Sequence, residues 1–570
     1  CIRDRFLYSN QKIDQEKVKY IFKTRGHKKI QSHSNDKYNL LTAPKTLVAN
    51  ENYIGENELG KGNYAVGIGT YFYKDSYGKE ALREVFNDIE TVISDNPVYG
   101  HWAFCIRKNG ETYIINDMSG FMRLFITQEG NNIIVSSSML AVVSAMNQPK
   151  FDKPKLSGFL AGRYGAEATF IQNINTLDPH KYIVISEDGT VNWNDKAIPE
   201  VPRIQTLEEA VIYVKTLLNK QMSVIKGALR DEKVYTDATG GLDSRLIASN
   251  LHSTGINFDF MNYPIFGPDA EIAEILSKGI NKKLHVQTDD RVEKDNIKEH
   301  LGEFDYGNNF FRQYANPRWN IENKFEFSGA RGECIDLPDI YSDEDLSFMK
   351  DTRPEVLLKN LTVGPMMTEL QKDLYLGYLM NLLSEREGFK KGIKLSEKQQ
   401  VKFTQFFAGQ FGDAMYNSGA QANLYFYSLY NEWHFNHFIS DIAFDAKKCR
   451  KLTLALISSI DPELGSFPFV SRMNTARRSV NEVHELPMKY SVYPSWLKNL
   501  MPLWLKNFLY NKVGLRKNNI DKSLLKGINW DLYKDVVRVN QLKKYPIYFH
   551  TIIKRIYSLE QVRTYLKIEF

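Results

Sequence analysis

The clearest chemical pattern in the chain is the six-residue sequence TGGLDS at positions 239–244. An apolar run precedes it and an amphipathic run follows it, so a strand, a turn and a helix are expected in that order. Two successive glycines permit a sharp turn and a close approach of the backbone to an anion. The free N–H groups at the start of the helix favour phosphate. The sequence therefore predicts a phosphate-binding loop made of Thr239, Gly240, Gly241, Asp243 and Ser244.

The side chains of this loop add a second expectation. Thr239 and Ser244 supply hydroxyl donors, whereas Asp243 would repel bare phosphate, so its presence indicates a bound Mg²⁺ ion. The same residues also fit an ordinary tight turn between a strand and a helix, with Asp243 or Ser244 as the helix cap. They do not form a Walker A loop, because the Gly-Lys-Ser/Thr ending of that motif is missing.

The elements around the loop alternate between strands and helices. A polar stretch with Pro199 and Pro202 is expected to be a linker, and Thr206 is expected to cap the next helix, with Glu209 in its first turn. The strands expected after it are Lys233–Ala238, Asn257–Tyr263, Lys283–Gln287 and Lys324–Ser328, and the helices are Ser244–Leu251 and Asp269–Gly279. This alternation predicts a doubly wound parallel sheet. After about Thr352 the chain is expected to be mainly helical.

The first 195 residues have a different pattern. Short alternating or β-branched runs, divided by Gly, Asn and Asp turns, indicate a layered, strand-rich domain. The pair Asn109-Gly110 is a hairpin signal, and Gly78 to Val92 is expected to be a helix. The expected strands include Tyr64–Tyr73, His101–Arg107, Thr112–Asn116, Asn132–Ser137 and Lys181–Ser186.

The phosphate loop resembles the pyrophosphate-binding loop of the asparagine synthetase family, usually written SGGxDS. The resemblance implies that the loop holds the β,γ-phosphates of ATP with Mg²⁺ nearby, and that the enzyme adenylates a carboxylate, releases pyrophosphate and admits an amine. Asp269 to Ala273 stand where the family has an Asp-led helix beside the nucleotide. Ser440 to Leu464 are similar to the helical segment that follows the synthetase core.

The segment Phe327 to Glu333 resembles the second loop of that family, SGxGxDE. The resemblance places Gly329 at the nucleotide and gives Glu333 a catalytic role in contact with the metal or the adenylate. A surface or capping carboxylate is the alternative for Glu333. Cys334 stands where a second acid is usual, and Arg331, which occupies a common glycine position, suits a substrate carboxylate or a phosphate. The synthetase lysine has no clear match, with Lys447, Lys448 and Lys451 as candidates.

The N-terminal half resembles the family's glutaminase, an N-terminal nucleophile (Ntn) domain of class II glutamine amidotransferases. In that domain the first residue is a cysteine whose thiolate attacks glutamine, with the α-amine as base, and Cys1 has the arrangement needed. The segments that match are Gly100–Phe104, Asn116–Phe121, Val135–Ser138 and Thr169–His180.

The glutamine pocket departs from the family pattern. The usual HRGPD segment is at best Arg25-Gly26-His27, and Gly67 to Tyr71 stand near the place of the NGE motif that builds the oxyanion hole. Without a placed donor, thioester chemistry loses about 10²–10³ in rate. Cys1 is therefore either the glutaminase nucleophile or incidental. Relatives such as β-lactam synthetase and lasso-peptide cyclases have a silent glutaminase and let an amine of the substrate attack.

Taken together, these patterns predict a multi-domain α/β protein. Residues 1–195 are expected to form an Ntn-type αββα sandwich, and 206–480 an ATP-pyrophosphatase domain with the adenine-nucleotide α-hydrolase-like fold. Residues 481–570 are expected to form a helical extension, in which Trp496, Trp504 and Trp530 are expected to pack in a core. The expected cofactors are ATP and Mg²⁺.

The expected function is carboxylate–amine ligation, with aspartate and glutamine as the best-known substrates and glutamine or free ammonia as nitrogen donor. Three alternatives stay open: another carboxylate, such as a uronic acid in surface-glycan synthesis or a peptide side chain; activation of a tRNA nucleobase; and a non-catalytic pseudo-synthetase. The strand-rich N-terminal half argues against the tRNA alternative, so no nucleic-acid partner is expected. The oligomeric state is open.

Composition is compatible with these expectations. The 570 residues are 43% hydrophobic and 25% charged, as in globular proteins. A net charge of +6, from 74 basic and 68 acidic residues, is mild for this length and weakly favours anionic ligands such as nucleotides. The four cysteines show no CxxC spacing, so neither a disulfide framework nor a zinc site is indicated. No apolar run reaches the ~18 residues of a membrane span, and a cytoplasmic location is expected.

Overall fold

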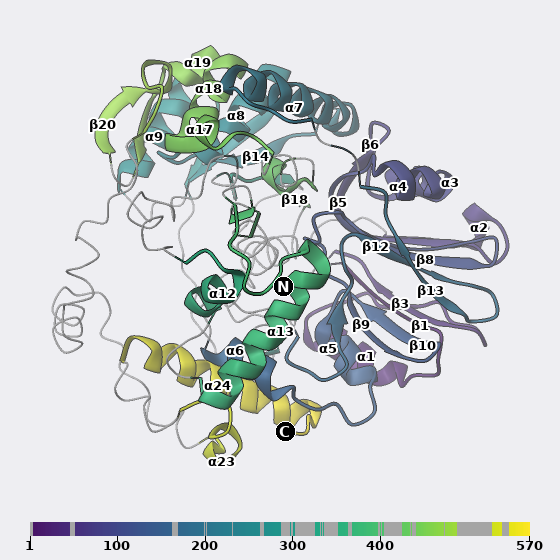
Figure 1. Cartoon of the computed structure of the whole chain (residues 1–570). Helices are drawn as coiled ribbons and strands as arrows, with labels where there is room; N and C mark the ends of the chain where they lie inside the picture. The colour runs from purple at the N-terminus through teal and green to yellow at the C-terminus, as the bar shows by residue number, and fades with distance from the viewer. Residues whose placement is uncertain are drawn as a thin grey trace.

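Two antiparallel sheets built from residues 5–195 face each other in the computed structural model (Figure 1). The first has the order β11-β9-β10-β1-β3-β2, with β1 (Arg5–Ser9), β2 (Gln31–Ser32), β3 (Asn39–Ala43), β9 (Phe125–Glu129), β10 (Asn132–Ser136) and β11 (Asn175–Thr176). The second has the order β13-β12-β8-β7-β5-β4, with β4 (Tyr53–Ile54), β5 (Tyr64–Tyr73), β7 (Tyr99–Lys108), β8 (Glu111–Asn116), β12 (Lys181–Ile185) and β13 (Val191–Asp195), while β6 (Ser76–Tyr77) pairs with β5.

The structure describes only part of the chain. The described residues are 4–45, 52–161, 169–198, 200, 202–230, 232–262, 267–286, 297, 300–301, 325–330, 332, 335, 351–362, 367–396, 399–400, 402–403, 425–433, 435, 441–471, 474–486, 527–538 and 546–570. Among them, no helix is both long enough and apolar enough to cross a membrane.

Alternation along the strands produces four layers. On β1, Phe6 and Tyr8 point toward the second sheet, whereas Leu7 points toward the helices on the opposite face. The outer face of the first sheet is covered by α1 (Gln15–Thr24), α5 (Met139–Ala145) and α6 (Lys153–Ala161). The outer face of the second is covered by α3 (Gly78–Asn87) and α4 (Ile89–Asp95), and α2 (Glu56–Leu59) precedes β5. The layers are therefore helix, sheet, sheet and helix, and we call this part the two-sheet unit.

Local signals account for several of these elements. The five strands expected here are confirmed to within two residues at either end. Asn109 and Gly110 join β7 to β8 with φ of 54° and 92°, as a hairpin turn with two left-handed residues requires. The prediction of a single helix from Gly78 to Val92 is wrong in one respect. Asp88 leaves the helical conformation and divides the segment into α3 and α4. Its carboxylate accepts a hydrogen bond from Tyr73, which lies on β5.

A parallel sheet forms the core of the second unit, as the alternation of elements predicts. Its strand order is β16-β15-β14-β17-β18, with β14 (Val234–Asp237), β15 (Phe258–Asn262), β16 (Leu284–Val286), β17 (Phe325–Phe327) and β18 (Tyr425–Tyr427). Helices α7 (Leu207–Leu229), α8 (Leu242–Thr254), α9 (Gly267–Gly279) and α18 (Lys451–Ile460) contribute to its core. Thr206 and Glu209 form the expected capping box at the start of α7. We call this part the parallel-sheet unit.

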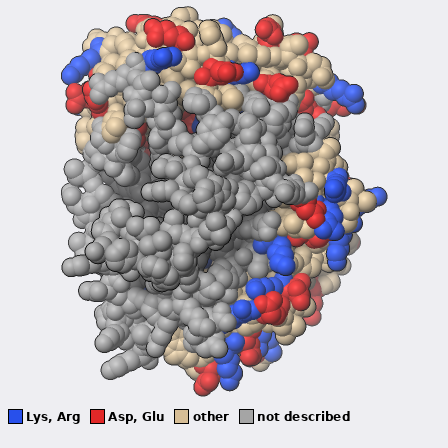
Figure 2. All heavy atoms as spheres, turned by 60° about the vertical axis from the view of Figure 1, so that its left-hand side comes forward, with Lys and Arg blue, Asp and Glu red and all other residues tan. Residues whose placement is uncertain are grey.

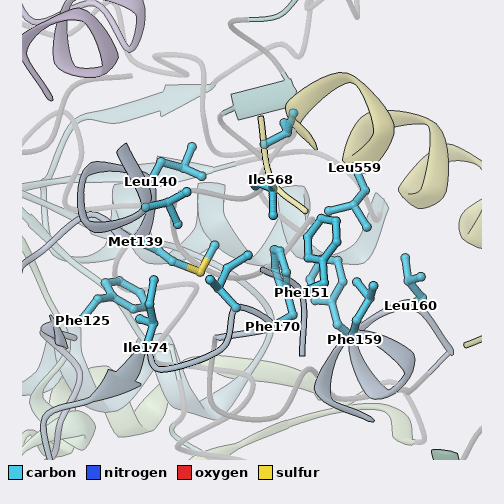
Figure 3. Close-up of a cluster of buried hydrophobic side chains, with 14 of the residues drawn as sticks. Phe125, Met139, Leu140, Phe151, Phe159, Leu160, Phe170, Ile174, Leu559 and Ile568 are labelled. Carbon is cyan, nitrogen blue, oxygen red and sulfur yellow. The ribbon is translucent and has the colours of Figure 1, made fainter. Parts of the chain in front are cut away.

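The described segments near the C-terminus pack against the two-sheet unit. Helix α24 (Pro546–Leu566) contributes Leu559 to the same core as Phe151, Phe159 and Phe170 (Figure 3). Lys150 forms a parallel bridge with Glu569, which continues the contact beyond the helix. Helices α12 (Pro354–Thr362), α13 (Glu369–Glu387) and α23 (Trp530–Tyr533) also contribute to this core. Trp530 packs against this core as expected, whereas Trp496 and Trp504 lie outside the described residues. The domain boundaries themselves stay predictions.

The region after Thr352 is not uniformly helical. Besides its helices, which include α17 (Phe444–Lys447) and α19 (Pro462–Ser466), with 3₁₀ turns η4 (Leu429–Asn431), η5 (Lys448–Arg450) and η6 (Val480–Glu482), it contains strands β18, β19 (Pro468–Ser471) and β20 (Asn474–Ser479). Strand β18 is the fifth of the described parallel sheet, pairing with β17, and β19 pairs with β20 in a hairpin. Short runs of this kind carry no helical or strand period long enough to be recognised.

A buried arginine holds α19 and the start of β19 against α8. Arg245 is 1% exposed, and its guanidinium donates to the carbonyls of Leu464 at 3.3 Å, Phe467 at 2.8 Å and Pro468 at 2.8 Å. Six residues after Leu464, β19 reaches the phosphate loop, where the N–H of Val470 donates to the carbonyl of Gly240 at 2.9 Å. Arg245 therefore links the first turns of α8 to the segment that packs on the loop.

Replacing Arg245 with methionine is expected to lower the melting temperature of the protein by about 5 °C, because buried carbonyls lose their donor at about 1–3 kcal/mol each. The matched control is Arg83→Met, since Arg83 pairs with Glu58 at the surface and such pairs contribute about 1 kcal/mol or less. Thermal unfolding of both variants, followed by circular dichroism, checks the difference. Equal melting temperatures would contradict a structural role for Arg245.

Candidate nucleotide site

The phosphate loop lies where the strand order of the parallel sheet reverses. From β14 the chain first adds β15 and β16 on one side of the sheet and then β17 and β18 on the other. In open parallel sheets, ligands bind at the carboxyl ends of the strands at such a switch point, because the two loops leave the sheet in opposite directions. The chain leaves the sheet at this position after β14 and again after β17.

Internal hydrogen bonds hold the phosphate loop in shape. The hydroxyls of Thr239 and Ser244 lie 2.8 Å apart, and Thr239 also accepts from the N–H of Gly241 at 3.1 Å. The N–H of Gly240 donates to Asp269 at 2.8 Å, so the Asp-led helix α9 contacts the loop directly. Gly241 is the N-cap of α8 and provides no side-chain cap. The N–H groups of the first turn of α8 are left for another acceptor, such as phosphate.

The second loop packs onto the first. A Cβ atom on Gly329 would lie 2.5 Å from the nitrogen of Ser244 and 2.8 Å from the carbonyl carbon of Asp243, so only glycine fits here. Ser328 donates from its hydroxyl to Asp237 at the end of β14, at 2.8 Å, and accepts from the N–H of Ala330 at 3.2 Å. The structure thus places Gly329 against Asp243 and Ser244, two residues of the phosphate loop.

An arginine that the sequence did not indicate lies at the centre of this arrangement. Arg450 donates to Oδ1 of Asp243 at 2.6 Å, and both side chains are half-buried or deeper, at 15% and 29% exposure. Cys449 and Arg450 both adopt left-handed backbone conformations, with φ of 58° and 59°. Both residues lie in η5, directly before α18.

The basic run around Arg450 contains the three lysines expected as candidates for a synthetase lysine. Lys447 is buried at 1% exposure, and Lys451 pairs with Glu485 at 3.1 Å. The side chain of Lys448 lies outside the described residues. The sequence contained one signal for Arg450, its place in a basic run beside the synthetase-like segment, but nothing in the run distinguished it from its neighbours.

The site residues fit a nucleotide phosphate and, in part, a magnesium ion. Backbone N–H groups, two hydroxyls and Arg450 offer donors to phosphate, while Asp237, Asp243 and Asp269 stand around the loop as oxygen ligands of the kind that Mg²⁺ prefers. Each of these carboxylates also accepts a hydrogen bond within the protein. A Mg²⁺ ion at Asp243 would therefore use Oδ2 or displace Arg450 from Oδ1.

Several predicted site residues lie outside the described residues. These are Cys1, Arg331, Glu333 and Cys334. Their roles stay predictions, including Glu333 as a metal and adenylate ligand and Cys1 as a nucleophile. Cys105 is described, and it is the buried apolar residue expected: burial raises the pKa of its thiol to about 12.

The segments near the expected glutamine pocket are described, and they are occupied by internal contacts. The N–H of Gly69 donates to Asp4 at 3.0 Å, and Asp4 forms a buried ion pair with Lys45, also at 3.0 Å. A Cβ on Gly69 would lie 2.0 Å from the carbonyl oxygen of His101, so close packing of β5 on β7 explains this glycine. His27 is buried, and burial together with Arg5 and Arg25 holds its pKa well below the usual value.

The two units meet at a buried carboxyl. Glu432 is 6% exposed, and its Oε1 accepts from the N–H of Gly100 at 2.6 Å and from the hydroxyl of Tyr427 at 2.5 Å. Gly100 belongs to β7 of the two-sheet unit, whereas Tyr427 ends β18 of the parallel sheet. The ring of Phe72, from β5, packs against Tyr427 with centroids 5.6 Å apart. Burial raises the pKa of the Glu432 carboxyl to about 8.

This pKa gives a pH dependence of stability with a definite sign. A carboxyl with a pKa near 4.5 unfolded and about 8 folded binds more protons in the folded protein, so its contribution to stability is present below pH 4.5 and is lost as pH rises toward 8. Glu432→Gln keeps the Oε1 acceptor and removes the titration. We expect the wild-type protein to lose up to about 1.4 kcal/mol of stability per pH unit in this window relative to the variant.

Melting temperatures of both proteins between pH 5 and pH 8.5 check this expectation. The difference between them isolates Glu432 from Asp117, whose pKa burial raises, and from Lys196, whose pKa burial lowers to about 7. Parallel pH profiles would contradict the assignment of a titrating carboxyl at this interface.

Acidic and basic side chains are mixed on the described surface. Figure 2 shows one face on which Lys and Arg lie among Asp and Glu rather than in a single basic field. This mixture agrees with the mild net charge of +6.

Comparisons with known proteins leave the family open. No protein-family model matches the chain. No curated protein matches it either. Among solved structures, glutamine phosphoribosylpyrophosphate (PRPP) amidotransferase from B. subtilis, complexed with ADP and GMP, aligns with TM-score 0.24 and 11% identity over 45% of this chain and 65% of that one. A structure described as the allosteric regulatory enzyme of purine biosynthesis aligns with TM-score 0.24 and 10% identity, over 51% of this chain and 67% of that one. The chain thus spans less than two thirds of the first of these structures.

Proposed function

We propose that this chain is an ATP-dependent amide-bond synthetase. It would adenylate a carboxylate, release pyrophosphate and pass the acyl group to ammonia or another amine, as asparagine synthetases do. The observation that carries the proposal is the contact between the two loops at the switch point, where Gly329 packs on the backbone of Asp243 and Ser244. The resemblance of both loops to the synthetase motifs supports it independently.

Different residues would contact the phosphates of ATP and the metal ion. The first-turn N–H groups of α8 and the hydroxyls of Thr239 and Ser244 hold phosphate oxygens, and Gly240 and Gly241 allow the backbone to approach them. Asp243 and Glu333 would hold Mg²⁺, which, when bound, neutralises charge on the leaving pyrophosphate. Arg450 lies beside Asp243 and offers a second positive charge to the same phosphates.

Stabilisation of the leaving group is the step that this geometry favours. As the carboxylate attacks the α-phosphate, negative charge accumulates on pyrophosphate, and donors already fixed around it lower the barrier without reorganising. The internal hydrogen bonds of the loop provide that fixed arrangement. The resulting acyl-adenylate is then open to attack by an amine.

A silent N-terminal domain is the second candidate, and one observation favours it. The N–H of Gly69, in the segment nearest the place of the oxyanion-hole motif, donates to Asp4 rather than facing a free pocket. In this variant of the proposal, free ammonia or an amine of the substrate completes the amide. An Ntn-type glutaminase with Cys1 as nucleophile remains the first form of the proposal, with its four-layered two-sheet unit in support.

Pyrophosphate release from Mg-ATP tests the proposal. A panel of carboxylates, including aspartate and uronic acids, is assayed with ammonium or with glutamine. Release with glutamine that is lost in Cys1→Ala and rescued by ammonium establishes a glutamine-dependent synthetase. Release with ammonium alone establishes the silent form. No release with any carboxylate, together with no ATP binding in an equilibrium titration, would refute the proposal.

A further inference from the structure

A six-residue segment from Tyr427 to Glu432, which we call the junction segment, contacts the two-sheet unit and both loops of the candidate nucleotide site. It begins at the end of β18 and continues through η4. Its residues are buried, with exposures between 0% and 6%. Side-chain hydrogen bonds from this one stretch reach all three parts, so it links them directly.

The first end of the segment holds the second loop. The carbonyl of Tyr427 accepts from the N–H of Ser328 at 2.9 Å, and the hydroxyl of Ser428 donates to the carbonyl of Ala330 at 2.7 Å. These two bonds flank Gly329, the residue that packs on the phosphate loop. The position of Gly329 therefore depends on the junction segment.

The middle of the segment holds the phosphate loop. The hydroxyl of Tyr430 donates to the backbone carbonyl of Asp243 at 2.6 Å, and Tyr430 is 1% exposed. Asp243 lies in the first turn of α8, so this bond fixes the turn that carries the N–H groups expected to bind phosphate. A hydroxyl that is buried and satisfied in this way has a defined position, since leaving its buried partner unpaired is unfavourable.

The last residue of the segment holds the two-sheet unit. Glu432 accepts from the N–H of Gly100, where β7 begins, and from the hydroxyl of Tyr427, which in turn accepts from Gln221 of α7. The ring of His101, the next residue on β7, lies 5.4 Å from that of Tyr427. Docking of β7 and the positions of both loops are thus connected through one short, buried stretch of chain.

We propose that the junction segment couples the two-sheet unit to the nucleotide site, with Glu432 and Tyr430 as positioning residues that keep both loops in place only while β7 is docked. The nucleotide named in this proposal rests on the proposed function, whereas the coupling itself rests on the contacts above. The two loops then form a competent site as a consequence of domain docking, and loosening β7 loosens the site.

Ionisation of Glu432 offers a way to weaken docking without removing atoms. Among the described residues, the groups that face its carboxyl are Tyr427 from β18, Tyr99 and the backbone of Gly100 from β7, and Asp117 after β8. Burial and the nearby Asp117 both disfavour a negative charge on Glu432. Below pH 8 the carboxyl is neutral, because burial raises its pKa to about 8.

The coupling is tested in the full chain by hydrogen exchange of two segments, 98–104 on β7 and 238–246 on the phosphate loop, in the absence of nucleotide. Tyr430→Phe should speed exchange of 238–246 by about threefold to tenfold and leave 98–104 unchanged, as loss of one hydrogen bond implies. Glu432→Leu should speed exchange of both segments. The matched controls are Tyr533→Phe and Glu560→Gln, which alter a buried tyrosine–carboxylate bond of 2.8 Å in the C-terminal core.

A pH profile of ATP binding supplies the second measurement and covers the case in which Glu432→Leu does not fold. At pH 6.5, Glu432→Gln should bind Mg-ATP within twofold of the wild-type protein, and at pH 9 it should bind at least threefold more tightly than wild type. Exchange of 238–246 that responds to Tyr430→Phe or Glu432→Leu no more than to the controls would overturn the coupling. A protein that binds no ATP but shows the expected exchange would refute the proposed function alone.

Discussion

Replacing Gly329 with alanine will reduce ATP-dependent pyrophosphate release by at least about a hundredfold, because a catalytic geometry displaced by about 1 Å loses roughly that much. The added Cβ would meet the backbone nitrogen of Ser244 at 2.5 Å and the carbonyl carbon of Asp243 at 2.8 Å. Neither contact involves a flexible side-chain end, so one of the two loops must move. This movement would separate the phosphate loop from the loop that follows β17.

Single-turnover pyrophosphate release and equilibrium ATP binding measure this effect. The matched control is Gly377→Ala, because Gly377 lies within α13 and a Cβ there meets nothing within 4 Å. Alanine in a helix interior is about 0.5–1 kcal/mol better than glycine, so the control should be at least as stable as wild type. Wild-type rates in Gly329→Ala would show that the loop contact has no part in the reaction.

Replacing Asp243 with asparagine is expected to lower Mg-ATP-dependent turnover by about a hundredfold or more, since a lost metal contact removes several kcal/mol of charge stabilisation. Asparagine keeps the size of the side chain and still accepts a hydrogen bond from Arg450 through its oxygen. What it removes is the negative charge that balances Arg450 and attracts the cation. Turnover should therefore fall even though the loop stays folded.

A second readout distinguishes this role from a structural one. With the charge of Asp243 removed, one negative charge is lost beside Arg450, so binding of ATP without metal should be unchanged or tighter while the response to Mg²⁺ weakens. Titrations of ATP with and without Mg²⁺ measure both, with Asp531→Asn as the control because that carboxylate is 90% exposed. An unchanged response to Mg²⁺ would remove Asp243 from the metal site.

Much of the local structure could be predicted because it depends on neighbouring residues. The capping box of Thr206 and Glu209 needs only two residues three positions apart, and the turn at Asn109 and Gly110 needs only two residues that tolerate positive φ. The strand, glycine turn and helix of the phosphate loop are likewise contiguous. Periodicity identified several strands of both units for the same reason.

The site as a whole is a property of the tertiary structure. Gly329 and Ser244 are distant in the chain, and only the pairing of β17 with β14 brings them into contact. Arg450 bonds to Asp243, Tyr430 also bonds to Asp243, and Glu432 bonds to Gly100, and the two residues in each of these pairs are far apart in the chain.

By itself, the sequence indicated which residues have the chemistry to bind phosphate and where many of the strands and helices form, because these depend on side-chain chemistry and short-range backbone preferences. It did not determine which cation faces Asp243, that a carboxyl from the parallel-sheet unit caps β7, or that the last helix completes the core beneath the first sheet. Those features follow from contacts between residues far apart in the chain. Only the folded structure selects among the many such contacts that the sequence allows.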